Sequence, residues 1–241
     1  MATHINYVWI NEEKTDVADR EVTSAINHTY IDVALENAKA NPDANLNIWV
    51  DFKLLDPTSE FFLTSHLYLM GTSNVTLRNI RVLPDYDNDP IFDTSNPKDI
   101  WARVDYARVL VLKESLSEAE PDDLVIYSDF DAEDLALKDS ELKRTLQFHD
   151  MAFAATIDGL ENGFMAFKKT ETNVALVHTL AQDSKKAAQA NAKSRKALVD
   201  VICAHAATQG TKQTDYWGKR MPNMGDKMLP NSEYADLGLH G

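Results

Sequence analysis

The amino-acid sequence predicts an α/β fold built on a largely parallel sheet. Short runs rich in β-branched and aromatic residues alternate with segments of helical periodicity across roughly the first 150 of the 241 residues. This alternation is typical of parallel sheets covered by helices. No linker, internal repeat or low-complexity tract divides the chain, and its length suits one large domain. We therefore expect a single domain over residues 1–241.

The predicted strands are apolar runs that end at turn-forming residues. The first two, INYVWI and LNIWVDF, are separated by a segment of helical spacing that closes at Asn41-Pro42, because helix is disfavoured before a proline. Two late runs, MAFAATI and GFMAFKK, are joined by a polar turn. Strands are expected at residues 5–10, 46–52, 74–83, 122–131, 151–157 and 163–169.

Helices are predicted where apolar residues recur every third or fourth position. Asp99 precedes one such run and can cap its first turn. Residues 84–98 are polar and contain three prolines, which indicates a surface loop. Residues 209–241 are rich in Gly, Pro, Asn and Asp, which indicates a C-terminal loop or lid. Helices are expected at 17–40, 58–70, 99–116, 139–148 and 171–208, the last with one break.

The composition disfavours several classes of protein. A net charge of −14 offers no positive surplus for a phosphate backbone, so we expect no nucleic-acid partner. No apolar run is long enough to span a bilayer, and the first residues lack the pattern of a secretory signal. The single cysteine, Cys203, excludes an internal disulfide and fits a reducing compartment such as the cytoplasm.

The stretch VIYSDFDAE, residues 125–133, raises the main functional question. A solvated acidic turn is one interpretation. However, two carboxylates at the end of a buried strand repel each other and cost desolvation free energy, and a divalent cation with hard oxygen ligands removes that cost. Ligands of α/β sheets bind beyond the carboxyl ends of the strands, where Trp9, Asp51 and Asp129–Asp131 are all expected. Because the chain lacks a P-loop and a G-x-G-x-x-G motif, a bound diphosphate would depend on the cation.

Two enzymatic chemistries use such a D-x-D motif. In haloacid-dehalogenase-like phosphatases the first Asp is a nucleophile, but Glu133 stands where that motif has a small or β-branched residue. In sugar transfer from a nucleotide diphosphate, the cation stabilises the leaving group. Sugar transfer also needs an aromatic platform, for which Trp9 is a candidate, and polar groups such as Asp105 and Arg108 at i and i+3. Trp9 could instead be a core residue, and Asp105 and Arg108 could form a weak ion pair on the surface.

The segments INYVWI, NIWVD, DYAR, VIYSDFD and LENGFMAF, in that order, resemble the metal-dependent GT-A glycosyltransferases of the D-x-D sugar-binding superfamily. They are most similar to bacterial members that modify host proteins. These are the glucosyltransferase domains of large clostridial-type toxins and the secreted effectors that place N-acetylglucosamine on arginine. The resemblance implies one GT-A domain with a mixed, mostly parallel sheet flanked by helices. It also implies transfer of glucose or N-acetylglucosamine from a UDP-sugar to a protein acceptor. The protein would act in the cytoplasm, or in a host cytoplasm after secretion without a signal peptide.

The resemblance implies a donor site built from Asp129, described below with the metal, and from four further residues. Trp9 would stack on uracil through its π-surface, and Tyr127 would lie beside the donor. Asp105 would hydrogen-bond sugar hydroxyls. Arg108 would reach the sugar or the diphosphate with its fork of donors.

The resemblance also implies a metal site for Mn²⁺ or Mg²⁺. Asp129 would contact the ribose and hold the cation through water, and Asp131 would ligate it directly. In the family a C-terminal loop completes the metal shell, and Asn231 and Ser232 are the matching candidates here.

Glu161 and Asn162 match a Glu-Asn pair that lies by the acceptor and the sugar in the arginine-modifying effectors, so they are candidate catalytic residues. The histidine that precedes this pair in those effectors is replaced here by Asp150, which leaves the acceptor residue open.

Three alternatives to this function remain. One is a non-catalytic relative that binds a UDP-sugar, and another is the phosphatase. The third is a polysaccharide-building glycosyltransferase, which EAEPDD disfavours because it replaces the usual Gly-Gly pair.

Overall fold

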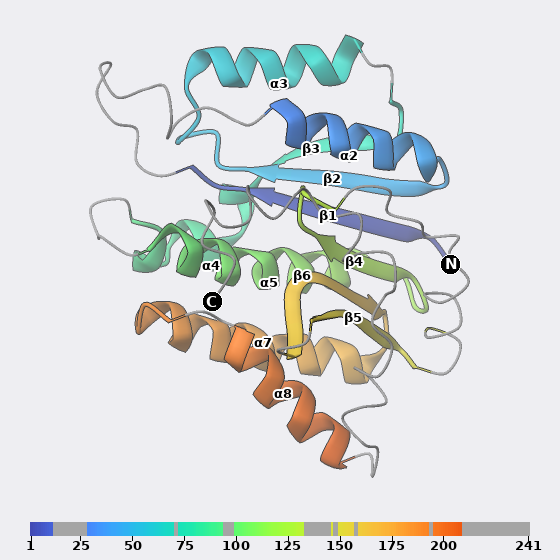
Figure 1. Ribbon diagram of the computed structural model, residues 1–241, viewed down its shortest axis with the longest axis vertical. Coiled ribbons are helices and arrows are strands. Elements are labelled where there is room, and N and C mark those ends of the chain that lie inside the picture. The colour runs from blue at the N-terminus through green and yellow to red at the C-terminus, as the bar shows by residue number, and fades with distance from the viewer. Residues whose placement is uncertain are drawn as a thin grey trace.

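A computed structural model shows one six-stranded sheet with helices on both faces (Figure 1). The strands are β1 (Thr3–Trp9), β2 (Ala44–Val50), β3 (Val75–Asn79), β4 (Leu124–Ser128), β5 (Met151–Thr156) and β6 (Gly159–Lys168). The structure describes residues 1–11, 28–69, 72–93, 99–132, 146, 149–156, 159–192 and 195–208.

The sheet is mixed and mostly parallel, as predicted. Its strand order is β3-β2-β1-β4-β6-β5. Strand β1 pairs in parallel with β2 and β4, and β2 pairs in parallel with β3. Strand β6 runs antiparallel to both β4 and β5. The carboxyl ends of β1, β2, β3 and β4 therefore meet at one edge of the sheet.

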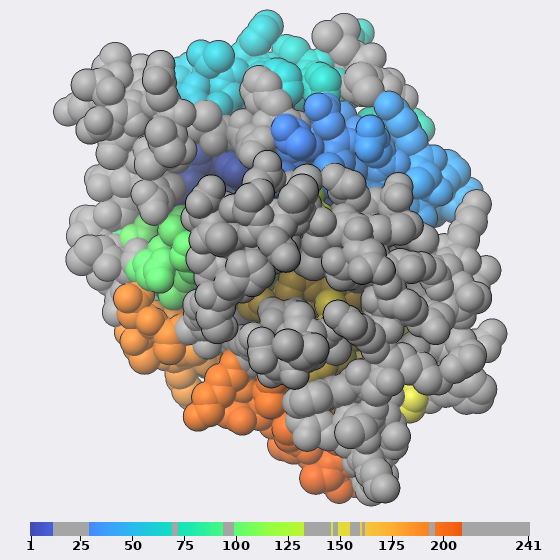
Figure 2. Space-filling view, viewed as in Figure 1, coloured from blue at the N-terminus to red at the C-terminus, as the bar shows by residue number. Residues whose placement is uncertain are grey.

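Alternate residues of the central strands enter two different cores, because successive strand side chains point to opposite faces. Tyr7 packs with the residues of α2 (His28–Ala40), whereas Val8 packs with those of α5 (Ile100–Glu118). Figure 1 shows α2 and α3 (Pro57–Leu69) on one side of the sheet, and α5, α7 (Glu171–Gln189) and α8 (Arg195–Thr208) on the other. Figure 2 shows the same division in space-filling form, with α2 and α3 at the top and α7 and α8 below.

Two helical predictions are confirmed within the described residues. The side chain of Asp99 accepts a hydrogen bond from the backbone N–H of Trp101 at 3.0 Å and caps α5 as expected. The expected break in the segment 171–208 separates α7 from α8. The predicted helix at 17–40 is seen from His28 onward. Its first part (17–27), most of the predicted helix at 139–148 and the whole tail at 209–241 lie outside the described residues.

The prediction for residues 74–98 is wrong in two places. Strand β3 ends at Asn79, whose side chain accepts from the N–H of Arg81 and starts the 3₁₀ helix η1 (Ile80–Val82). The expected surface loop forms the short helices α4 (Pro84–Asp87) and η2 (Pro90–Phe92), and it buries Tyr86 and Phe92. The rings of these two residues stack at 3.9 Å, so a few apolar residues outweigh the polar composition of the segment.

The polar turn expected between the last two strands is shorter than predicted. Strand β6 already begins at Gly159, so the sequence LENG belongs to the strand itself. The pairing with β5 also shifts, because Phe153 is opposite Met165 whereas Ala154 is opposite Glu161. This irregularity, called the bulge in β6 below, leaves residues 162–164 without partners in β5. Irregularities of this kind bend a strand and redirect its side chains.

Candidate active site

The candidate site lies beyond the carboxyl ends of the adjacent parallel strands β1 and β4. These strands pair from Thr3 opposite Leu124 to Asn6 opposite Tyr127, so Trp9 and the D-x-D segment leave the sheet at the same edge. Helix α5 packs across both strands and contributes Asp105 and Arg108. The elements that the sequence predicted to meet are therefore brought together.

Arg108 is the centre of a buried polar network. Its Nη2 lies 3.0 Å from Oδ1 of Asp129, and its Nη1 lies 3.2 Å from Oδ1 of Asp105. Nη1 also donates to Oδ1 of Asn162 at 3.0 Å. The Nδ2 of Asn162 in turn donates to Oδ1 of Asp105 at 2.8 Å, which closes a ring of three side chains from α5 and β6.

The Asp105–Arg108 pair is not the weak surface ion pair that was one of its two interpretations. Arg108 is 4% exposed and Asp105 is 9% exposed. Ion pairs contribute little when water surrounds them, but a buried charge needs its partner. The hydroxyl of Tyr127 donates to Oδ1 of Asp129, and the ring of Tyr127 lies under the guanidinium at 5.4 Å.

Two residues of β6 lie next to the D-x-D segment. Asn162 joins the Arg108 network, and the pairing of β4 with β6 continues past Ser128 and Phe164, so that the N–H of Asp129 donates to the carbonyl of Gly163 at 2.8 Å. A Cβ atom at position 163 would lie 2.8 Å from Oδ2 of Asp129, closer than such atoms approach. Sequence reasoning missed Gly163, although a glycine inside a strand often marks close approach of another group.

Within the described part of the chain, the candidate site holds more acidic than basic side chains. The carboxylates of Asp105, Asp129 and Asp131 surround the guanidinium of Arg108, and Asp131 is 4% exposed. The pKa of the Asp129 carboxyl is raised to about 7, chiefly by burial and to a smaller extent by Asp131 and Asp105, while Arg108 and the hydrogen bond from Tyr127 oppose the rise. The raised pKa is the expected sign of buried acidic groups that lack full compensation.

The described residues fit part of a divalent cation site. Asp129 and Asp131 provide hard carboxylate oxygens, and a 2+ charge would balance three carboxylates against one guanidinium. Within the described part of the chain, no group of three or more His, Cys, Asp or Glu side chains is placed to hold a metal ion. Further ligands would therefore come from water, from a bound diphosphate or from elsewhere in the chain. The candidates Asn231 and Ser232 lie outside the described residues.

Trp9 is a half-buried residue in an aromatic cluster. Its ring packs against Tyr30 at 5.8 Å and against Phe130 at 6.1 Å, and its Nε1 donates to Asn11 at 2.6 Å. Phe130 stands between the two motif aspartates, so it connects the ring of Trp9 to the acidic site. Trp9 thus combines packing with partial exposure, which suits a base platform as well as a place at the rim of the core.

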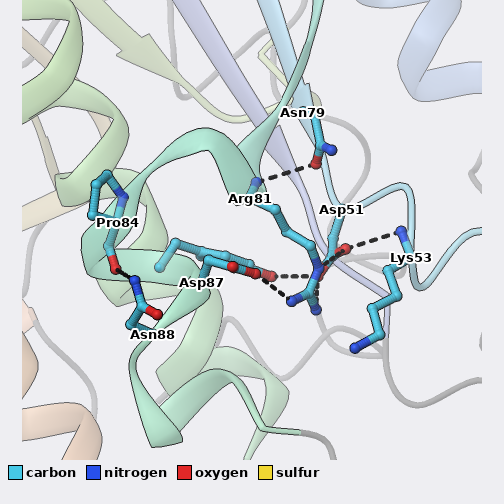
Figure 3. A network of polar contacts seen from close by, with 8 residues as sticks. Asp51, Lys53, Asn79, Arg81, Pro84, Asp87 and Asn88 are labelled. Carbon is cyan, nitrogen blue, oxygen red and sulfur yellow. Dashed lines mark hydrogen bonds and ion pairs between the residues drawn. The ribbon is translucent and has the colours of Figure 1, made fainter.

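Asp51 is not part of this site, although the sequence places it at the same edge. Figure 3 shows its carboxylate held by Arg81, with Nε to Oδ1 and Nη2 to Oδ2 both at 2.7 Å. The hydroxyl of Tyr86 donates to Oδ2 at 2.9 Å, and the pKa of Tyr86 is raised by burial and by Asp51, which keeps this donor protonated. Asp51 therefore joins the end of β2 to η1 and α4.

The structure places Asp150 but does not describe the side chain of Glu161. The backbone of Glu161 pairs with Ala154 next to the bulge, and its side chain lies outside the described residues. Asp150 precedes β5 at the end where Lys168 is opposite Leu124, which is the edge of the sheet away from the D-x-D segment. Asp150 therefore lies away from the candidate site.

The mixed sheet with helices on both faces and an acidic site beyond its parallel strands defines an α/β domain. A solved transferase, studied as a double cysteine mutant, aligns with 89% of this chain and 89% of its own at a TM-score of 0.52 and 11% identity. The bacterial N-acetylglucosamine transferase NleB aligns over 85% of this chain and 86% of its own, with a TM-score of 0.46 and 13% identity. The galactosyltransferase LgtC, solved with donor and acceptor sugar analogues, aligns over 84% and 70%, with a TM-score of 0.46 and 13% identity.

At these identities the likeness concerns the fold alone. The sequence matches no protein-family model and no curated protein. Among the helices that the structure describes, none has the length and apolar character needed to cross a membrane.

Proposed function

We propose that this protein is a glycosyltransferase that moves a sugar from a UDP-sugar to an acceptor with the help of Mn²⁺ or Mg²⁺. The observation that carries the proposal is the buried excess of negative charge at Asp129 and Asp131, beside Arg108, at the carboxyl ends of parallel strands. A cation held there would neutralise the charge that develops on the departing diphosphate.

The residues around this charge have complementary roles in the proposal. The half-exposed ring of Trp9 stacks on the uracil, and Phe130 keeps that ring next to the D-x-D segment. Arg108 holds Asp129 through Nη2 and Asn162 through Nη1, so its guanidinium lies beside the diphosphate that the cation would bind. Asn162 is hydrogen-bonded to both Asp105 and Arg108 and fixes the two side chains in the positions from which they contact the sugar.

The acceptor in this proposal is a protein of another cell's cytoplasm. The motif resemblance to secreted bacterial effectors supports it, together with the single cysteine. Glu161, next to Asn162 on the bulged strand, is the candidate for contact with the acceptor. A polysaccharide acceptor is the competing case, and the experiment below includes it.

Intact-mass analysis tests the proposal directly. Candidate acceptor proteins and free oligosaccharides are incubated with the chain, Mn²⁺ and a panel of UDP-sugars. A hexose or N-acetylhexosamine mass added to a protein, only with one donor and with metal, is the expected result. Transfer to oligosaccharides alone would favour polysaccharide synthesis. UDP-sugar binding without hydrolysis or transfer would favour a non-catalytic relative, and turnover of a simple phosphate ester would favour a phosphatase.

A further inference from the structure

Asn37 connects the D-x-D segment to the neighbouring strand. This residue lies on α2, is 1% exposed and belongs to neither the acidic network nor the aromatic cluster. Its Nδ2 donates to the hydroxyl of Tyr7 at 3.0 Å and to the carbonyl of Ala132 at 2.9 Å. Both acceptors are far away in sequence, so these hydrogen bonds do not serve the helix itself.

The two acceptors belong to the two halves of the candidate site. Ala132 directly follows Asp131, and its N–H donates back to the carbonyl of Asp129 at 3.2 Å, which closes a turn around the motif. Tyr7 lies in β1 two residues before Trp9, and its ring packs on Phe130 at 4.9 Å. The turn is therefore held at two points. The ring of Phe130 packs on Tyr7 of β1, and the carbonyl of Ala132 accepts a hydrogen bond from Asn37 of α2.

We propose that Asn37 is a positioning residue that holds the turn of Asp129–Asp131 in the conformation that binds the cation. The inference rests on the proposed function, because it assumes that Asp131 is a metal ligand. Asn37 acts through the backbone of Ala132 and does not touch the cation or the donor. Groups that orient metal ligands in this way commonly change metal affinity by about 10- to 100-fold when they are removed.

The competing interpretation is that Asn37 is only a satisfied polar residue of the core. The chain contains a matched residue for this comparison. Asn173 on α7 is also 1% exposed, and its Nδ2 donates to the carbonyls of Asp150 at 2.8 Å and Lys168 at 2.9 Å. Those carbonyls lie at the opposite edge of the sheet. Loss of either amide removes two hydrogen bonds from a buried side chain, but only Asn37 adjoins the motif.

The experiment compares Asn37→Ala with Asn173→Ala in the full chain. Thermal unfolding is expected to show a similar fall in Tm for both variants. Binding of Mn²⁺ in the presence of UDP is then measured from the electron paramagnetic resonance signal of free Mn²⁺. We expect the Kd for Mn²⁺ to rise at least about 10-fold in Asn37→Ala and to stay at the wild-type value in Asn173→Ala.

Two more variants keep the test decisive. Asn37→Ser, with a shorter side chain and a single donor, is the substitute if Asn37→Ala does not fold, and the same weakening is expected. Tyr7→Phe removes only the second acceptor and should leave Mn²⁺ affinity unchanged. Equal Mn²⁺ affinity in folded Asn37 and Asn173 variants would overturn the positioning role. Failure of the wild-type chain to bind Mn²⁺ with UDP would instead overturn the proposed function, so the two failures are distinguishable.

Discussion

At the scale of single residues, the carboxylates of the D-x-D segment differ in their surroundings. Asp129 is held by Arg108 and Tyr127, and its backbone is held by Gly163. Asp131 lies in the turn that Ala132 closes and is 4% exposed. Asp129 is therefore restrained by charged and polar side chains, whereas the direction of the Asp131 carboxylate depends on the conformation of the turn.

Asp131→Ala should abolish metal-dependent hydrolysis of a UDP-sugar, because the proposed function makes Asp131 a direct ligand of the cation. Asp131→Asn, which keeps the shape but not the charge, should be nearly as severe. The measurement is the rate of UDP release with and without Mn²⁺. A folded variant that keeps more than about a tenth of the rate, a change of only about 1.4 kcal/mol in the barrier, would remove Asp131 from the metal site.

Trp9→Ala should weaken UDP and UDP-sugar binding by the same factor, because both share the uracil. A stacked base contributes roughly 1–3 kcal/mol, which corresponds to about 5- to 150-fold in Kd. Calorimetry measures both affinities, and Trp9→Phe serves as the control that keeps a ring beside Phe130 and Tyr30. Unchanged UDP affinity in a folded Trp9→Ala variant would make Trp9 a packing residue only.

At the scale of elements, β6 reaches the site where its pairing with β5 is interrupted and its pairing with β4 is not. Asn162 contacts Arg108, and Gly163 continues the register with β4 by accepting from the N–H of Asp129. Helix α5 contributes in a different way, since Arg108 contacts both Asp129 and Asn162, and Asp105, one turn earlier, contacts Asn162 as well. The site is thus assembled by one helix and one irregular strand.

Gly163→Ala should displace the Asp129 carboxylate and weaken Mn²⁺ binding in the presence of UDP, because the new Cβ would lie 2.8 Å from Oδ2. A double-mutant cycle with Asp129→Ala checks the cause. In the Asp129→Ala background, where the clashing oxygen is gone, Gly163→Ala should have no further effect on Mn²⁺ affinity. Additive losses would show that Gly163 acts on something other than this carboxylate.

The Asp51–Arg81 pair belongs to the connection between β2 and α4 and should affect stability, not donor binding. Removing one partner of a buried pair costs about 3–5 kcal/mol, because the other charge stays uncompensated. Arg81 is partly exposed while Asp51 is buried, so we expect the lower end of that range for Arg81→Ala. Urea unfolding measures it, with Lys113→Ala at the exposed Asp85 pair as the control, for which about 1 kcal/mol or less is expected. A large loss of UDP affinity in folded Arg81→Ala would place Asp51 in the site after all.

At the scale of the whole molecule, the net charge of −14 and the local acidic excess act in the same direction. Both would repel the anionic UDP-sugar of the proposed function, so in that function the cation and Arg108 supply the attraction. Binding of donor and metal should therefore be linked, with each strengthening the other by the same factor.

This linkage predicts the thermal behaviour of the chain. UDP alone should raise Tm very little, and UDP with Mn²⁺ should raise it clearly. At a ligand concentration of 100 times Kd, the stabilisation is about 2.7 kcal/mol. Differential scanning fluorimetry with Mn²⁺ alone, UDP alone and both together measures it. Equal stabilisation by UDP with and without Mn²⁺ would contradict a metal-dependent donor site.

The sequence by itself determined the class of fold and the edge at which the candidate site lies. Alternating apolar strands and amphipathic helices are local patterns, and the D-x-D motif after a buried strand is visible without any structure. Burial of the Asp105–Arg108 pair could not be predicted in the same way, because an i and i+3 pair looks the same on a buried and on an exposed helix face. The roles implied for Trp9, Asp131 and Glu161 remain predictions.

Only the tertiary structure decided which acidic and amide groups belong together. It separated Asp51, neutralised by Arg81, from Asp129 and Asp131, although all three follow strands that end at one edge. It also revealed the bulge at Asn162–Gly163 and the link from Asn37 to Ala132. The physical reason is that these contacts join residues 54 positions apart for Arg108 and Asn162 and 95 apart for Asn37 and Ala132. Such contacts depend on how strands and helices pack, and no local sequence pattern encodes them.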